Sequence, residues 1–238
     1  TLRRQRQMCI RDRARGEESL FVRGSVGKGY ATNLEVQAGG VRLEQLDNLI
    51  RREVPLAGDV LVDMHIGGTL MEPEPSGRLA LRNTWLGKRE LEETTLFFET
   101  DSGTMQIAGG VAGNKLGLEG WLELWDEQRY AFFAELDDFP MHVLYPEAPD
   151  GTPVRSLVDG RIAMQGAAEQ PVQIDATISE ASLAWGSHEL RSEQPWQYTQ
   201  DGTAFAVTDV TLVGGQTEVR FGGNRMADGR VLLSLIHI

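Results

Sequence analysis

The amino-acid sequence predicts a mainly β protein, made of repeated antiparallel meander units with short interrupting helices. Three observations predict this class: apolar residues alternate with polar ones, turn-forming clusters separate the alternating runs, and the chain resembles itself at a spacing of about 98 residues. Alternation with a period of two is typical of a half-buried strand, because successive side chains point to opposite faces of a sheet.

The alternating runs follow one another along most of the chain. Clusters such as DSGT, AGNK, TQDGT and VGGQ lie between them and favour tight turns. Strands of seven to ten residues joined by such turns form a meander. In order, the runs lie at 60–66, 79–82, 96–98, 105–107, 116–124, 130–136, 162–164, 172–178, 205–207 and 219–221.

Composition and charge exclude several classes of partner. The chain has 238 residues, of which 41% are hydrophobic and 24% charged, and these values are typical of a folded protein. Its formal net charge of −12 argues against nucleic acid or an anionic membrane surface as the main partner, since those need basic patches. No apolar run reaches the roughly 18–20 residues of a membrane-spanning helix.

The two ends differ from the rest of the chain. The segment TLRRQRQMCIRDRAR holds six arginines, one aspartate and the only cysteine, Cys9. Both QMCIRDR and the closing LLSLIHI resemble strings that arise when sequencing-adapter DNA is translated. We therefore expect residues 1–15 and 234–238 to be artefactual tails without essential contacts. A nucleic-acid-binding arm is the less favoured interpretation of the basic end.

A shift of 98 residues aligns the two halves of the chain. Glycine, proline and apolar positions recur together over about seventy-five residues, and with one inserted residue GKREL aligns with GSHEL. The sequence thus predicts a duplicated unit. We place the first copy at 16–145, a proline-rich connecting loop at 146–156 and a truncated second copy at 157–233. Aligned pairs include Leu34 with Phe132, Met64 with Ile162, Gly68 with Gly166, and Pro73 with Pro171.

The stretch DVLVDMHIGGTLMEPEP, residues 59–75, raises the question of a glycine-rich ligand loop. A phosphate loop needs a glycine-rich turn that leads into a helix, usually with a lysine. The second copy reads GRIAMQGAAEQP and has neither feature. We therefore interpret the glycines and prolines as the end of one strand and the approach to the next.

Two short helices are expected at equivalent places. Leu43, Leu46, Leu49 and Ile50 follow helical spacing within Arg42–Arg52, and Asp138–Pro146 occupies the same place in the second copy. The adjacent carboxylates of ELDDFP invite a metal or acid–base interpretation, but at the entrance to a helix an aspartate is better explained as a cap.

The order of these features resembles the repeat unit of the TamB and AsmA-like proteins of Gram-negative envelopes. The segments VRLEQLDNLIRREVPLAGDVLVDMHIGGTLMEPEPSGRLALRN and AELDDFPMHVLYPEAPDGTPVRSLVDGRIAMQGAAEQPVQIDATIS carry the likeness. The resemblance implies an elongated, strongly curved sheet with an apolar groove that is open along one side. It also implies a role in phospholipid transfer between the inner and outer membranes and in outer-membrane biogenesis. By the same resemblance the segment belongs to the periplasm, with an inner-membrane anchor and an outer-membrane barrel partner beyond it.

If this resemblance holds, phospholipid acyl chains are the cargo, and the apolar positions of the strands line the groove. Neighbouring residues of the opposite parity, Asp63, His65, Arg78, Arg82 and Arg161, should point outward. The alternative is a repetitive structural or adhesin-type stalk with a closed core and no cargo. The groove candidates are Val60, Val62, Met64, Ile66, Leu79, Leu81, Leu96, Phe98, Ile107, Leu116, Leu118, Phe132, Ile162, Met164, Ile174, Phe205 and Val207.

Nothing in the sequence favours an enzyme. The four histidines lack metal-ligand spacing, and we interpret them as surface residues. No serine lies in a G-x-S-x-G frame. The tryptophans are best explained by packing rather than by a sugar-binding platform. We therefore expect no catalytic residue, no metal and no cofactor.

Overall fold

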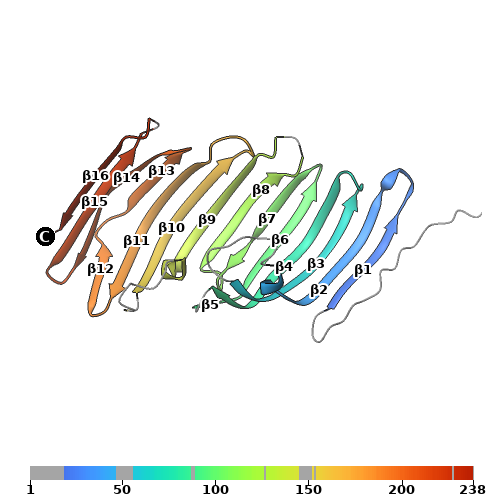
Figure 1. Ribbon diagram of the computed structural model, residues 1–238, viewed down its shortest axis with the longest axis horizontal. Coiled ribbons are helices and arrows are strands. Elements are labelled where there is room, and N and C mark those ends of the chain that lie inside the picture. Colours follow the sequence, from blue (N-terminus) through green and yellow to red (C-terminus); the bar gives the residue numbers. More distant parts are fainter. Residues whose placement is uncertain are drawn as a thin grey trace, which may run out of the picture. The chain divides into compact units, whose positions relative to one another are not determined.

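The computed structural model describes residues 19–46, 56–86, 89–125, 127–144, 152, 154–226 and 228–237. Backbone hydrogen bonds join their strands into a sixteen-stranded antiparallel sheet with the order β1-β2-β3-β4-β6-β7-β8-β9-β10-β11-β12-β14-β15-β16 (Figure 1). β5 pairs with β4, and β13 pairs with β11 and β14. The strands are β1 (Ser19–Val26), β2 (Thr32–Arg42), β3 (Leu56–Gly68), β4 (Pro73–Leu86), β5 (Arg89–Leu91), β6 (Thr94–Asp101), β7 (Thr104–Val111), β8 (Leu116–Glu123), β9 (Tyr130–Phe139), β10 (Val154–Gly166), β11 (Gln173–Trp185), β12 (His188–Ser192), β13 (Trp196–Asp201), β14 (Ala204–Gly214), β15 (Thr217–Arg225) and β16 (Val231–His237).

The mainly β prediction is confirmed. Each alternating run of the sequence overlaps a strand. The structure has sixteen strands among its described residues, more than the number of alternating runs in the sequence. Alternation explains their formation, because each strand presents apolar side chains to one face and polar side chains to the other. In the stretch DVLVDMHIGGTLMEPEP, Gly68 ends a strand, as predicted. It is the last residue of β3 and has a φ of 70°.

The chain divides into two compact units. Unit 1 consists of residues up to 114 together with 121–126, and unit 2 consists of 115–120 together with residues from 127 onward. β1 to β7 therefore lie in unit 1 and β9 to β16 in unit 2, while β8 contributes to both.

The two units share one order of elements. β2, β3 and β4 of unit 1 correspond to β9, β10 and β11 of unit 2, and the bounds of β3 shifted by 98 residues coincide with those of β10. The pairing register recurs as well, since Leu34 opposes Ile66 in unit 1 and Phe132 opposes Met164 in unit 2. The order of these strands and their pairing register therefore recur at a spacing of 98 residues.

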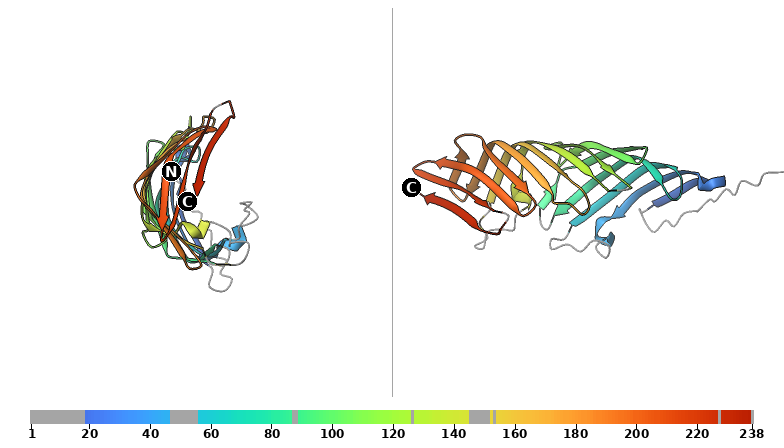
Figure 2. Two further views of the ribbon diagram at one scale, coloured as in Figure 1. Left: turned by 90° about the vertical axis from the view of Figure 1, so that its left-hand side faces the viewer. Right: turned by 90° about the horizontal axis from the view of Figure 1, so that it is seen from above.

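The described parts of the two expected helices contain single 3₁₀ turns. The described part of Arg42–Arg52 holds a single 3₁₀ turn, η2 (Leu43–Leu46), and residues 47–52 lie outside the described ranges. In the second copy η3 (Met141–Leu144) is also a 3₁₀ turn and begins three residues later than predicted. In Figure 2, η2 lies beside the strands of unit 1 and η3 beside those of unit 2, where they contact β3 and β10 respectively. A third 3₁₀ turn, η1 (Lys28–Tyr30), connects β1 to β2 at the glycines 27 and 29.

The prediction that the ELDDFP aspartates cap a helix is wrong. Asp137 and Asp138 lie inside β9, at a bulge where β9 has two residues without partners on β10. Asp138 has a φ of 47°, and Gly40, 98 residues earlier, has a φ of 65° at the corresponding bulge of β2. Aspartate tolerates this left-handed conformation better than most residues, so the pair is explained by a β-bulge.

The closing segment, expected to make no essential contacts, contributes residues 234–237 to a strand of the sheet. β16 pairs with β15 along its whole length, from Val231 opposite Arg225 to His237 opposite Val219. Its large side chains stay exposed, with Leu233 at 78% and Leu235 at 73%. Residues 1–15, the other expected tail, lie outside the described ranges.

Little of the described chain is fully buried. Val210, with an exposed fraction of 1%, is the large side chain that is most completely enclosed among the described residues. The described helices are no longer than four residues, and the described strands all belong to the one sheet. The described residues therefore supply neither a helical layer nor a second sheet to cover its faces.

Candidate functional site

Strand register gathers the groove candidates of unit 1 on one face of its sheet. Val62 opposes Leu79, and Leu79 opposes Leu96 on the next strand. Directly paired residues of an antiparallel sheet point to the same side, so the row continues across β2, β3, β4, β6 and β7. We call this surface the apolar face of unit 1; its members are Val22, Leu34, Val36, Val60, Val62, Met64, Ile66, Leu79, Leu81, Leu96, Phe98, Met105 and Ile107.

Unit 2 repeats this arrangement. Met164 opposes Phe132 on one side and Ile174 on the other, and a further row passes from Ala176 through Tyr198 to Val207. A backbone hydrogen bond of 2.9 Å from the Asp137 N–H to the Lys115 carbonyl sets the register of β8 on β9. We call the resulting surface the apolar face of unit 2; its members are Leu116, Leu118, Phe132, Ala134, Leu136, Ile162, Met164, Ile174, Ala176, Ile178, Tyr198, Phe205 and Val207.

Every groove candidate therefore lies on one of the two apolar faces, as the alternation predicts. Their burial is intermediate: Val60 is buried at 7% exposure, and the other sixteen candidates are half-buried. Such side chains contact strand neighbours and still reach the surface of the described structure. A sandwich core would instead leave most of them fully enclosed.

The opposite face of each sheet carries the charges. Asp63, His65, Arg78, Arg82 and Arg161 are all exposed, in agreement with the predicted parity. Their contacts are those of a solvated surface: the His65 ring bonds to the Asn33 side chain across the strands, and Arg161 lies 3.5 Å from the opposing Glu135. We call this side the charged face. By contrast, no charged residue lies on the apolar face of unit 1 at the described positions of β1 to β4, β6 and β7.

Two shallow pockets lie mostly on the charged face. One, of about 330 Å³ in unit 1, is lined by Phe21, Gln37, Asp63 and Arg78 among others. The other, of about 350 Å³ in unit 2, involves Asp209, Asn224 and Ser234 among its lining residues. Neither coincides with the centre of an apolar face.

The sequence analysis missed several members of the apolar faces. Val22, Leu34 and Val36 of unit 1 alternate as clearly as the named candidates, so the signal was present in the sequence. Trp196 also belongs to the apolar face of unit 2, since it opposes Ile178, and its indole N–H is buried without a hydrogen-bond partner. Its six-residue strand, WQYTQD, is mostly polar in sequence, which hides the alternation.

Candidate metal ligands do not converge in the described ranges. No three histidine, cysteine, aspartate or glutamate side chains there lie close enough to hold a metal ion. His142 is half-buried rather than on the surface as predicted, and its Nδ1 lies 3.0 Å from the carbonyl oxygen and 3.1 Å from the nitrogen of Ser156, which ties η3 to β10. Glu189 accepts hydrogen bonds from Arg191, and these bonds, together with its charge, raise the pKa of that guanidinium.

The tryptophans divide between the surface and local packing. Trp85, Trp121 and Trp185 are exposed by 42%, 37% and 53%. Trp125 packs against Gly103, where an added Cβ would lie 2.9 Å from its ring.

Comparisons with known proteins give no match: no family model, no curated protein and no solved structure is significantly similar to this chain. Within the described residues, no helix has both the length and the apolar composition to span a membrane.

Proposed function

We propose that the chain is a segment of a TamB/AsmA-like lipid-transfer protein, in which the apolar faces shield phospholipid acyl chains. The observation that carries this proposal is a pair of half-buried apolar faces, which recur in both units at equivalent strand positions. The described residues place neither a second sheet nor a helical layer over these faces. A face of this kind leaves apolar area in contact with water unless something apolar lies on it.

The energetics favour an acyl chain as the occupant. Each CH₂ group removed from water contributes about 0.8 kcal/mol, so even a partly covered chain gains several kcal/mol. Across unit 1, six strands lie side by side from β1 to β7. At about 4.8 Å per spacing they extend about 24 Å. That width exceeds the ~15 Å that one leaflet contributes to a bilayer's hydrocarbon core.

The setting follows from the resemblance of the sequence. A TamB/AsmA-like segment would work in the periplasm, tethered through an inner-membrane anchor and engaged with an outer-membrane barrel elsewhere in the full protein. Its role would be phospholipid transfer between the two membranes in support of outer-membrane biogenesis. In this proposal the protein is not an enzyme and needs no cofactor, because moving a lipid along an apolar surface breaks no bond.

Photo-crosslinking tests the proposal directly. A photoreactive residue is placed at Ile66 or Met164 on the apolar faces, and at His65 or Arg161 on the charged face as matched controls. In the full-length protein in cells, we expect phospholipid adducts at 66 and 164 and none at 65 and 161. Equal labelling at both parities, or no labelling in a folded protein, contradicts lipid transfer and favours a structural stalk without cargo.

A further inference from the structure

The hairpin of β4 and β5 brings two polar side chains to one face. In this hairpin Thr84 opposes Leu91 and Leu86 opposes Arg89. Thr84 and Arg89 are therefore diagonal neighbours on the same side, at about 7–8 Å, which is within reach of a long side chain. Leu86 also opposes Leu56 on β3, so the hairpin adjoins the Val60 end of the apolar face of unit 1.

Both polar groups are buried without partners. Thr84 is only 3% exposed, and its Oγ1 has no hydrogen-bond partner. Arg89 is half-buried, and its Nη1 is shielded from solvent, again without a partner. A guanidinium stays protonated at any working pH, so Nη1 is a buried cationic donor. Leaving such donors unsatisfied is costly, and native structures usually pair them.

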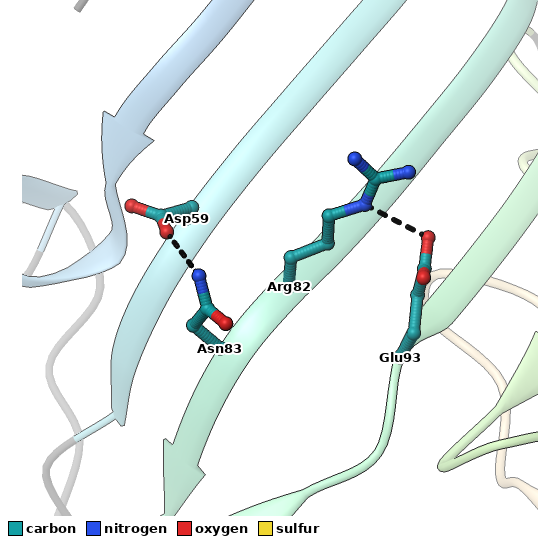
Figure 3. Close-up of polar contacts among 4 residues, drawn as sticks. All are labelled: Asp59, Arg82, Asn83 and Glu93. Carbon is teal, nitrogen blue, oxygen red and sulfur yellow. Dashed lines mark hydrogen bonds and ion pairs between the residues drawn. The ribbon is translucent and has the colours of Figure 1, made fainter. Parts of the chain in front are cut away.

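Two carboxylates close in the sequence, Glu93 and Glu90, do not meet this need. Glu93 pairs with Arg82 at 3.0 Å on the charged face, as Figure 3 shows. Glu90 opposes Trp85, is exposed, and lies on the other side of the hairpin from Arg89.

A β-bulge holds Thr84 in place. Asn83 has a φ of 49°, and its side-chain amide donates a hydrogen bond of 2.9 Å to Asp59 (Figure 3). Gly58 lies beneath the bulge, where an added Cβ would be 2.9 Å from the Thr84 Cα. The missing side chain of Gly58 thus lets Thr84 lie close against β3.

From this geometry we propose that Thr84 and Arg89 form an anion subsite that takes the phosphate of a phospholipid lying on the apolar face of unit 1. The Thr84 hydroxyl and the Arg89 guanidinium donate to two phosphate oxygens, and the acyl chains extend toward Val60 and Leu81. The position of the acyl chains in this inference rests on the proposed function. The contact with an anion is argued independently, from the two donors without partners. Free phosphate is the other source of the same chemistry.

Binding measurements with three probes separate these sources. The purified protein is titrated with short-chain phosphatidic acid, with diacylglycerol of the same chain length, and with inorganic phosphate. We expect phosphatidic acid to bind at least about tenfold more tightly than diacylglycerol, which is the usual gain from charge-assisted hydrogen bonds. Thr84→Val should reduce the preference for phosphatidic acid over diacylglycerol. Arg89→Met should abolish this preference, while binding of diacylglycerol persists.

Arg82→Met is the matched control. It removes an arginine from β4 on the charged face, so it should leave the lipid preference unchanged. Ligand-free Arg89→Met should melt at a temperature equal to or above that of the native protein, because it removes an unpaired buried charge.

The first two outcomes distinguish a failure of the subsite from a failure of the proposed function. Equal binding of the two lipids, or a preference that survives Arg89→Met, overturns the subsite and leaves lipid shielding intact. Binding of inorganic phosphate that depends on Arg89, without binding of either lipid, supports the anion subsite and contradicts the lipid proposal. Binding of none of the probes contradicts both.

Discussion

Gly40 and Asp138, 98 residues apart, adopt the same left-handed backbone conformation at equivalent bulges. We expect Gly40→Ala to destabilise the protein by about 1–2 kcal/mol, because a residue with a Cβ pays that cost in this conformation. Gly40→Asn should cost less, since a short polar side chain tolerates it. Asp138→Gly should change stability by less than about 0.5 kcal/mol, as relief of strain and added freedom of the unfolded chain oppose each other. Urea denaturation of the three variants checks the order, and equal costs for alanine and asparagine would contradict it.

Ile66 and Val210 offer the same substitution in two environments. Ile66 is half-buried on the apolar face of unit 1, whereas Val210 is 1% exposed. We expect Ile66→Arg to cost only about 1–2 kcal/mol, because a long side chain can carry its charge to water. Val210→Arg should cost more than about 4 kcal/mol or prevent folding, because the charge is buried without a partner. Similar losses of folding free energy at both positions would mean that the apolar face is a closed core.

Residue parity could be predicted from the sequence, whereas individual roles could not. Alternation alone places Val62, Leu79 and Met164 on one side of the sheet and Asp63 and Arg161 on the other. The bulges were missed because Gly-Gly and Asp-Asp look unrelated until the pairing register aligns them. Thr84 and Arg89 were missed because three residues of β5 carry no readable period, and burial without partners is a property of the folded chain.

Among the elements, β16 combines complete backbone pairing with little side-chain burial. Its residues 231–236 are all exposed. The net gain from each backbone hydrogen bond, about 0.5–1.5 kcal/mol, is offset by the entropy of ordering each residue, about 1–2 kcal/mol. We expect truncation after Arg230 to change the free energy of unfolding by less than about 1 kcal/mol, as measured by urea denaturation. A loss above about 2 kcal/mol would show that the strand is integral to unit 2.

The short helices mark the limit of periodicity as a guide. Helical spacing of Leu43, Leu46, Leu49 and Ile50 predicted eleven residues, and the described part is one 3₁₀ turn. The spacing placed the interruption correctly at the end of β2, where the described turn contacts β3. At Asp138 the preference for a cap was overridden by pairing of β9 with β10.

At the scale of the whole molecule, the strand order follows the 98-residue spacing found in the sequence. Few residues are identical between the copies, yet the 98-residue shift carries the elements and their register from unit 1 to unit 2. What recurs is the pattern of glycine, proline and apolar parity, which suffices to specify strand pairing. Each unit therefore has an apolar face built from strands in the same order, while details such as Arg89 in unit 1 and Trp196 in unit 2 differ between them.

Spin labelling measures directly whether lipid covers the apolar faces of the two units. Cys9, the only cysteine, is replaced by serine, and a single labelled cysteine is introduced at Leu79 or Ile162, with Arg78 and Arg161 as neighbours of opposite parity. Addition of phospholipid should slow the label and shield it from a water-soluble relaxation agent at 79 and 162, and leave it unchanged at 78 and 161. Equal effects at neighbouring positions, or no effect at 79 and 162 in folded protein, would contradict a lipid-bearing apolar face.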